Sequence, residues 1–175
     1  FDDTGRHRER GSARRERGSV FHGRLKMTRD ELTDIAVQVY DLKPPTEVTT
    51  TVRIMHGTQF TEAVLDFRPP DASFEATLQT EIADAEGFLR RAERKTVVHL
   101  YATDRPQLYE LGIPVMPIEG FWSINVQQKL PLGLDRDAVP PALIRRLQTL
   151  ALNATFGDLE PEEFTKSWVV GAVQD

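Results

Sequence analysis

The chain has no cysteine at all, and this absence excludes several kinds of chemistry. Without a thiol there is no disulfide, no zinc–thiolate centre and no cysteine nucleophile. Histidine is also scarce: the four histidines, His7, His22, His56 and His99, are scattered, with no HExxH motif and no close cluster with acids. We therefore expect no catalytic metal held by this chain alone.

The sequence also lacks long apolar runs and the motifs of common enzymes. No run approaches the roughly 20 apolar residues that cross a bilayer, and no signal-peptide pattern opens the chain. A P-loop, a GxGxxG turn after a strand and a GxSxG elbow are all missing. We expect a cytoplasmic protein with no complete active site in this chain. Because the chain begins at Phe1 instead of Met, we expect a fragment or a processed product.

What remains is the composition of a globular domain. The 175 residues are 39% hydrophobic and 28% charged, with a formal net charge of -5, which is typical of one folded domain of ordinary size. Residues 1–17 differ, because they are polar and rich in arginine. They predict a flexible, solvated segment. A nucleic-acid-binding arm is the sharper alternative, but no aromatic residues are interleaved with the arginines to stack on bases.

Two amphipathic helices are predicted from capping residues and apolar spacing. The first covers residues 29–40: Thr28 and Glu31 form a capping box before it, and a pair of prolines at 44–45 stops it. The second begins at a pair of prolines at 140–141 and ends at Gly157. Its predicted apolar stripe consists of Leu143, Ile144, Leu147, Leu150, Ala151 and Ala154.

Between these helices the pattern is that of strands. Alternating or β-branched segments predict strands at residues 18–27, 48–54, 58–67, 73–82, 94–101, 113–118 and 121–130. The segment 113–118 contains two prolines and fits an edge strand. A turn is expected at 84–87, and a short helix at 106–111 with Gly112 as its C-cap. His99 is expected to be a half-buried strand residue. The fold class is α+β, with a mixed, largely antiparallel sheet and helices on one face.

The stretch of residues 127–137 is the candidate site. An alternating segment ends on the cation Lys129, and a turn with proline and glycine then presents Arg136 between Asp135 and Asp137, just before a helix. This arrangement would suit the binding of a phosphate. The local chemistry alone favours a plainer interpretation, a strand-to-helix connection whose cations are solvated or paired with the neighbouring acids, because surface ion pairs are worth little.

A family resemblance bears on this choice. The sequence LPLGLDRD, residues 130–137, resembles the LPLNxSRE stretch in the middle domain of the ninety-kilodalton heat-shock chaperones, and Gln127-Gln128-Lys129 resembles the QTK loop of gyrase B. Both belong to the GHKL superfamily of gyrase, these chaperones, histidine kinases and MutL. From about Gly18 onward the chain looks most like uncharacterised bacterial and phage ATP-binding proteins of that superfamily.

The resemblance implies a transducer domain with a fold like the second domain of ribosomal protein S-five. In the family the arginine matched by Arg136 reaches the γ-phosphate of ATP held by a neighbouring domain, and the lysine matched by Lys129 acts similarly, so Arg136 is the implied catalytic residue and Lys129 and Gln127 the implied cofactor-binding residues. Gly133 and Asp135 stand where the chaperones have asparagine and serine. The family's ExxxNxxDA and DxGxG nucleotide motifs do not occur in this chain.

The implied organisation has three parts. Residues 1–27 are a basic segment and strand, or the end of a preceding ATPase domain; residues 28–157 are the transducer-like domain; and residues 158–175 are a C-terminal amphipathic helix. ATP and Mg²⁺ are expected to be bound mainly by an ATPase domain in cis. Two other classes stay open: a nucleic-acid-binding module, and an oligomerisation module, such as a homodimer, that uses Phe164 and Trp168.

Overall fold

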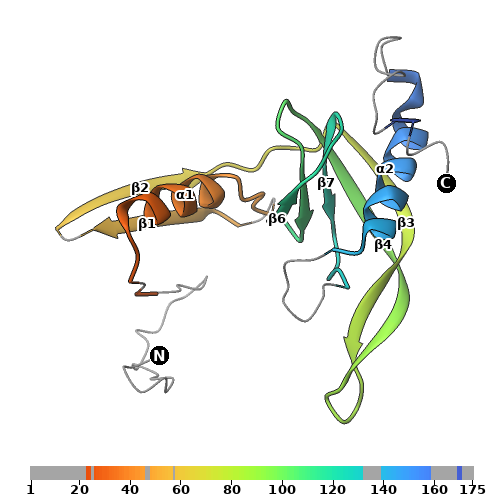
Figure 1. The fold of residues 1–175 in the computed structure, drawn as a ribbon, viewed down its shortest axis with the longest axis horizontal. Helices are drawn as coiled ribbons and strands as arrows, with labels where there is room; N and C mark the ends of the chain where they lie inside the picture. The colour runs from red at the N-terminus through yellow and green to blue at the C-terminus, as the bar shows by residue number, and fades with distance from the viewer. Residues whose placement is uncertain are drawn as a thin grey trace.

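The computed structural model describes residues 23–24, 26–45, 48–56, 58–131, 139–158 and 169–170. Within these ranges the chain is α+β, as predicted, with helices and two sheets (Figure 1). The elements in chain order are α1 (Arg29–Tyr40), β1 (Thr50–His56), β2 (Gln59–Leu65), β3 (Ala72–Ala83), β4 (Leu89–Ala102), β5 (Gln107–Glu110), β6 (Ile113–Pro117), β7 (Trp122–Val126), α2 (Pro141–Thr155) and the 3-10 helix η1 (Phe156–Asp158).

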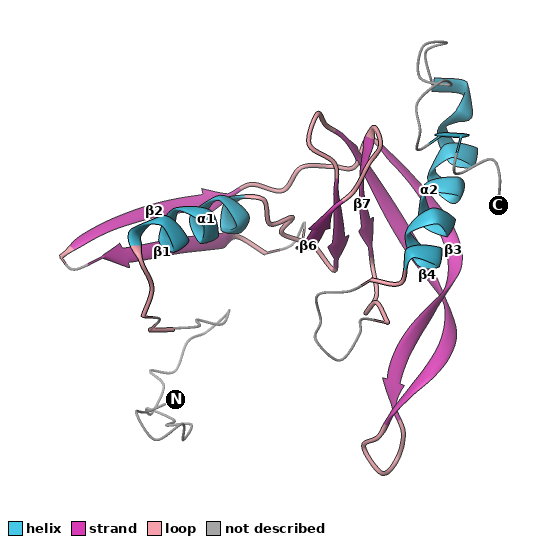
Figure 2. Ribbon diagram, viewed as in Figure 1, coloured by secondary structure: helices cyan, strands magenta, loops and turns pink. Residues whose placement is uncertain are grey.

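The larger sheet has five strands in the order β3-β4-β7-β5-β6. Its neighbours are antiparallel except for β5 and β7, which are parallel, so the sheet is mixed and largely antiparallel, as predicted. β6 lies at one edge, which confirms the edge strand expected from its prolines. The hairpin of β1 and β2 is a separate two-stranded sheet to one side of the larger one (Figure 2).

The hydrophobic core lies between the larger sheet and α2. Alternate residues of the strands face α2, and Leu100 from β4 and Leu147 from α2 are fully buried. The Trp122 Nε1–H donates to Thr155 Oγ1 at 3.1 Å, which fixes the last turn of α2 on β7. The predicted stripe of α2 is confirmed except at Ala154, which is exposed; Thr155, one residue further on, is the buried position.

α1 lies with the hairpin, apart from the larger sheet (Figure 1). Its capping box is confirmed: Thr28 Oγ1 accepts from the Glu31 N–H at 3.3 Å, and Glu31 Oε2 accepts from the Thr28 N–H at 2.7 Å. No residue of α1 is buried. The expectation that the helices gather on one face of the sheet is therefore wrong for α1, because periodicity predicts a helical face but does not say which element covers it.

The prediction of a short helix at 106–111 is wrong, because Gln107–Glu110 form the strand β5. Leu108 is buried on the face toward α2 and Tyr109 is buried on the other, which is the period of a strand. Leu111 (φ 52°) and Gly112 (φ 84°) then form a tight turn into β6, because positive φ at two central residues suits the twist of a hairpin. Parallel pairing with β7, a contact distant in sequence, decides the conformation of β5.

Several other boundaries differ from the sequence predictions. Residues 23, 24, 26 and 27 are not in a strand, and the rest of the strand predicted at 18–27 lies outside the described residues. β4 begins five residues earlier than expected at Leu89, and β7 ends at Val126 instead of at 130. The C-terminal helix predicted from Pro161 also lies outside the described residues, except that Val169 and Val170 are helical.

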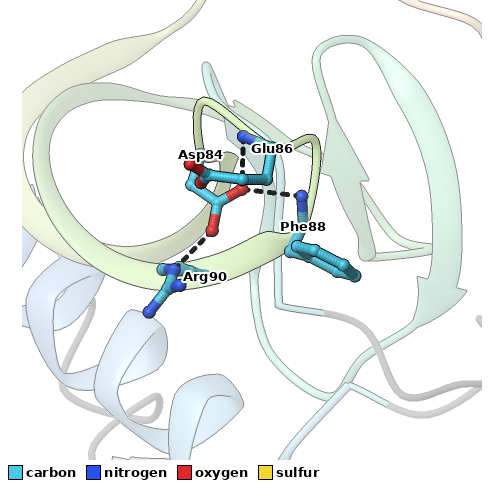
Figure 3. A network of polar contacts seen from close by, with 4 residues as sticks. All are labelled: Asp84, Glu86, Phe88 and Arg90. Carbon is cyan, nitrogen blue, oxygen red and sulfur yellow. Dashed lines mark hydrogen bonds and ion pairs between the residues drawn. The ribbon is translucent and has the colours of Figure 1, made fainter.

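The turn between β3 and β4 is held by Asp84 (Figure 3). Its Oδ1 accepts from the backbone N–H groups of Glu86 at 3.2 Å and Phe88 at 2.8 Å, and its Oδ2 accepts from Arg90 Nε at 2.6 Å. Gly87 supplies the positive φ of 86° that the turn needs. This stretch is the hairpin turn that the sequence predicted at 84–87.

Replacing Asp84 by alanine is expected to fray the distal end of the β3–β4 hairpin, because the Glu86 and Phe88 amides lose their acceptor. Hydrogen exchange followed by NMR should accelerate at these two amides, while the core amide of Leu100 keeps its protection. The matched control is Asp84→Asn, which retains an acceptor oxygen but loses the charge facing Arg90. It should give the smaller increase, and equal exchange in all three proteins would contradict this role of the carboxylate.

The same turn has a defined pH dependence. The ion pair with Arg90 and the hydrogen bonds from the turn amides hold the pKa of Asp84 below its ordinary value. A carboxylate with a lowered folded-state pKa stabilises the fold at pH values above its unfolded pKa. Its contribution is therefore expected to persist at neutral pH and to be lost as the pH falls through the folded-state value, as a carboxyl-carbon NMR titration of Asp84 would measure.

Candidate functional site

The corner that follows β7 carries two of the predicted site residues on a well-fixed backbone. The Gln127 N–H donates to the Val97 carbonyl oxygen at 3.0 Å, which continues the pairing with β4 beyond the end of the strand. Gln128 is buried, and its Nε2 donates to the carbonyl oxygens of Leu78 at 3.2 Å and Gln79 at 3.3 Å. These bonds join the corner to β3 and β4.

The next two residues are fixed from both sides. Thr80 Oγ1, on β3, donates to the Lys129 carbonyl oxygen at 2.7 Å. The N–H of the fully buried Leu130 donates to Glu110 Oε2, on β5, at 2.7 Å. The backbone of Lys129 is therefore held between two strands of the sheet, and its side chain leaves from a constrained position.

The side chain of Lys129 is held much less firmly than its backbone. Its Nζ lies 3.4 Å from Glu81 Oε2, a long separation for an ammonium and a carboxylate, which usually approach to about 2.7–2.9 Å. The Lys129 side chain is 40% exposed and that of Glu81 is 21% exposed. A half-exposed pair of this kind is weak, so the ammonium can exchange Glu81 for an incoming anion at little cost.

Arg136, with its neighbours Asp135 and Asp137, lies outside the described residues. The described chain stops at Pro131 and resumes at Val139, and both of these residues are buried. α2 then begins with no side-chain cap and no acid in its first turn. Its own first turn therefore does nothing to offset the partial positive charge at its N-terminus.

The structure places Gln127 and Lys129 on the same corner, and the half-buried side chain of Gln127 makes no hydrogen bond in the part of the chain that the structure describes. Three partners of this corner were not predicted: Thr80, Glu81 and Glu110. They are 49, 48 and 20 residues away from the groups that they bind. Only the strand register brings them close, so no local motif could have found them.

A second group of polar residues, also missed from sequence, lies on the sheet face opposite α2. Four residues there are each 3% exposed: Tyr101, Tyr109, Ser123 and Asn125. Asn125 Oδ1 accepts from the Gly112 N–H at 2.9 Å, and Ser123 Oγ accepts from the Gln107 N–H at 3.0 Å. Strand alternation alone could have placed Tyr101, Ser123 and Asn125 on one face, but the burial of that face depends on other segments.

His99 also lies on this face. It is half-buried, as predicted, and its Nδ1 is 2.9 Å from Ser73 Oγ on the neighbouring strand. Burial lowers the pKa of His99 from its ordinary value.

The two alternative functions, nucleic-acid binding and oligomerisation, depend on other residues. The arginine-rich residues 1–17, and Phe164 and Trp168, all lie outside the described residues. Within the described ranges, no helix is long and apolar enough to cross a membrane, and no three acid or histidine side chains form a possible metal site.

Comparisons with protein-family models, with curated proteins and with solved structures found no match to this chain. Its function therefore has to be argued from the geometry of its own residues.

Proposed function

We propose that this chain is the transducer module of a GHKL-type ATPase. In this proposal Lys129 and Arg136 contact the γ-phosphate of ATP held by a neighbouring ATPase domain, which also binds Mg²⁺, and the module relays the nucleotide state. The observation that carries the proposal is the contrast at Lys129 between a backbone fixed by hydrogen bonds from two strands and an ammonium loosely paired at 3.4 Å. A cation that contacts a ligand from another domain needs both properties.

The surroundings of Lys129 favour contact with a phosphate over a purely structural ion pair. A structural pair would be expected to have a short separation and an enclosed ammonium, whereas Lys129 is 40% exposed. The uncapped N-terminus of α2 adds partial positive charge at the end of the same connecting loop. Arg136, in that loop, would supply a planar guanidinium that can contact two phosphate oxygens at once.

The same corner gives a route by which the nucleotide state could be relayed. Leu130 before the connecting loop and Val139 after it are both buried in the core between the sheet and α2. Because packed cores resist small displacements, a pull on this loop would shift α2 against the sheet instead of being absorbed locally. We further propose a fold of the ribosomal-protein-S-five type, supported by the mixed sheet with its parallel pair β5–β7 and the helix that follows β7. We assign the protein to the cytoplasm and leave a homodimer open.

The test is ATP hydrolysis by the full-length gene product or, where the ATPase domain is a separate chain, by the reconstituted complex. Lys129→Ala is expected to lower kcat about a hundredfold, as does the loss of one positioned donor to a developing charge. Its melting temperature should change little, because a half-exposed ion pair contributes only about 0–1 kcal/mol.

Two control variants separate this role from general surface electrostatics. Lys95→Ala removes an exposed lysine that is paired with Glu75 at 2.6 Å elsewhere on the sheet, and it should leave kcat unchanged. Glu81→Gln frees the Lys129 ammonium and should not lower kcat. Turnover of Lys129→Ala within twofold of the unmodified protein, or no ATP hydrolysis by the assembled protein, would contradict the proposal.

A further inference from the structure

A small polar pocket of about 70 Å³ lies on the sheet face opposite α2. Its walls come from segments that are far apart in the sequence: the segment after α1, the segment before β3, the stretch from the end of β4 through the connection into β5, and the start of β7. The lining includes three cations and three buried hydroxyl-bearing residues: Lys43, Arg68, Arg105, Tyr101, Tyr109 and Ser123.

Lys43 is fixed in this pocket by its backbone and by two aromatic rings. Its N–H donates to the Gly112 carbonyl oxygen at 2.8 Å. Its Nζ lies 5.3 Å from the ring centroids of both Tyr101 and Tyr109, within the range of cation–π contacts. Burial lowers the pKa of Lys43, and the nearby Asp41 carboxylate opposes that effect. The ammonium is thus held in a partly dehydrated position where an anion would stabilise it.

Two arginines complete the positive lining. Arg68 has its Cζ 5.9 Å from the Tyr101 ring and donates to Asp71 Oδ2 at 2.8 Å. Arg105 is exposed and makes no ion pair with any side chain in the part of the chain that the structure describes. Among the described residues that line the pocket, Asp41 is the one carboxylate, and its Oδ2 already accepts from a glutamine amide at 3.3 Å. The pocket therefore has an excess of positive charge.

Neutral donors lie at the buried end of the pocket. Tyr101, Tyr109 and Ser123 are each 3% exposed. Burial and the Asp41 charge raise the pKa of Tyr109 to about 12, so its hydroxyl keeps its proton at neutral pH. Ser123 Oγ accepts from the Gln107 N–H at 3.0 Å, and a hydrogen bond between the Ser123 and Tyr109 side chains partly offsets the rise in the Tyr109 pKa. An anion that enters the pocket would therefore meet a linked pair of hydroxyl groups.

We propose that this pocket binds a phosphoryl group, as a small dianionic oxyanion, between the three cations and the buried hydroxyl groups. On the same measure of cavity volume, one water molecule needs about 10–15 Å³. A volume of about 70 Å³ therefore accommodates a tetrahedral oxyanion but not a nucleoside. Arginine and lysine together with neutral O–H donors are the groups that complement phosphate oxygens. A larger phosphorylated molecule would insert its terminal phosphate and leave the rest outside.

This site is independent of the Lys129 corner. Ser123 lies near the start of β7 and Lys129 beyond its end, so the two are separated by six residues, or up to about 20 Å of extended chain. Failure of the phosphate test would not affect the proposed ATPase role, and failure of the ATPase test would not affect this pocket.

The experiment is a titration of the ¹⁵N-labelled 175-residue chain with inorganic phosphate at constant ionic strength, with chloride as the reference anion. Saturable NMR shifts are expected at the amides of Lys43, Tyr101 and Tyr109, with a Kd of about 1 mM. Arg105→Ala should weaken binding about tenfold, because it removes a charge-assisted hydrogen bond. Arg91→Ala, an exposed arginine on the distal part of β4, is the matched control and should bind like the unmodified chain.

A second variant and a second probe complete the test. Lys43→Met keeps an apolar stem between the two rings but removes the charge, and it should also bind at least tenfold more weakly; if it does not fold, Arg105→Ala decides. Tighter binding of ribose 5-phosphate than of inorganic phosphate would support the terminal phosphate of a larger molecule as the ligand, and equal or weaker binding would support free phosphate. No saturable shift with either probe, or equal affinity in Arg105→Ala, overturns the proposal.

Discussion

Replacing Arg136 by alanine is expected to lower the turnover of ATP about a thousandfold in the proposed ATPase. This is the lower end of what an arginine supplied from a separate domain contributes to phosphoryl transfer. The guanidinium would neutralise charge that develops on the transferring phosphoryl group, so its loss should reduce kcat far more than it raises KM. The assay is steady-state ATP hydrolysis across a range of ATP concentrations, so that kcat and KM are separated.

The conservative variant gives the sharper control. Arg136→Lys keeps the charge but not the planar fork that contacts two oxygens, so it should recover only part of the lost rate. Arg91→Ala, which removes an exposed arginine from β4, should have the unmodified rate. If Arg136→Ala hydrolyses ATP within twofold of the unmodified protein while Lys129→Ala is impaired, the catalytic role belongs to Lys129 alone.

Replacing Gly112 by alanine is expected to destabilise the fold by about 3 kcal/mol or more. A Cβ at this position would lie 2.1 Å from the Lys43 carbonyl oxygen, a backbone atom that cannot rotate away. The φ of +84° adds strain of about 1–2 kcal/mol for any residue with a side chain. Relieving the clash would also break the hydrogen bond from the Lys43 N–H to the Gly112 carbonyl oxygen, worth about 1 kcal/mol.

Gly87 provides the matched control, because it has nearly the same φ, +86°, with no atom within 4 Å of an added Cβ. Gly87→Ala should therefore show the backbone strain alone, about 1–2 kcal/mol. Urea denaturation gives both values, provided that the m-value is unchanged between the variants. Equal destabilisation by the two substitutions would mean that the segment carrying Lys43 is not packed against Gly112 in solution.

Local signals in the sequence predicted much of the fold. The capping box at Thr28, the hairpin of β1 and β2 and the turn at Asp84 are each encoded within a few residues, and all three are present. The prediction for the segment that forms β5 was wrong because the conformation of this segment depends on pairing with β7, 16 residues further along the chain. The early start of β4 at Leu89 could not be predicted either, since its distal part is exposed and shows no apolar alternation.

The residues of the candidate site also differ in how far the sequence alone predicts them. Lys129 could be singled out from the sequence because it ends an alternating strand segment inside a short motif. Its partner Glu81 could not, because nothing in the local sequence of β3 distinguishes it from other strand residues. The phosphate pocket was missed entirely. Its three cations are separated in the sequence by 25 residues, from Lys43 to Arg68, and by 37 residues, from Arg68 to Arg105. Charged residues so far apart give no local pattern that would link them. The path of the chain after α1 brings Lys43 to the pocket, and the connections before β3 and after β4 bring Arg68 and Arg105.

The two edge strands of the larger sheet, β6 and β3, differ in how readily a strand of another molecule can pair with them. β6 ends the sheet with Pro114 and Pro117, neither of which has a backbone N–H. A strand from a second molecule would therefore find two backbone donors missing on β6, and fibre-like growth at that edge is disfavoured. Any assembly by strand addition to this sheet would have to begin along β3 instead.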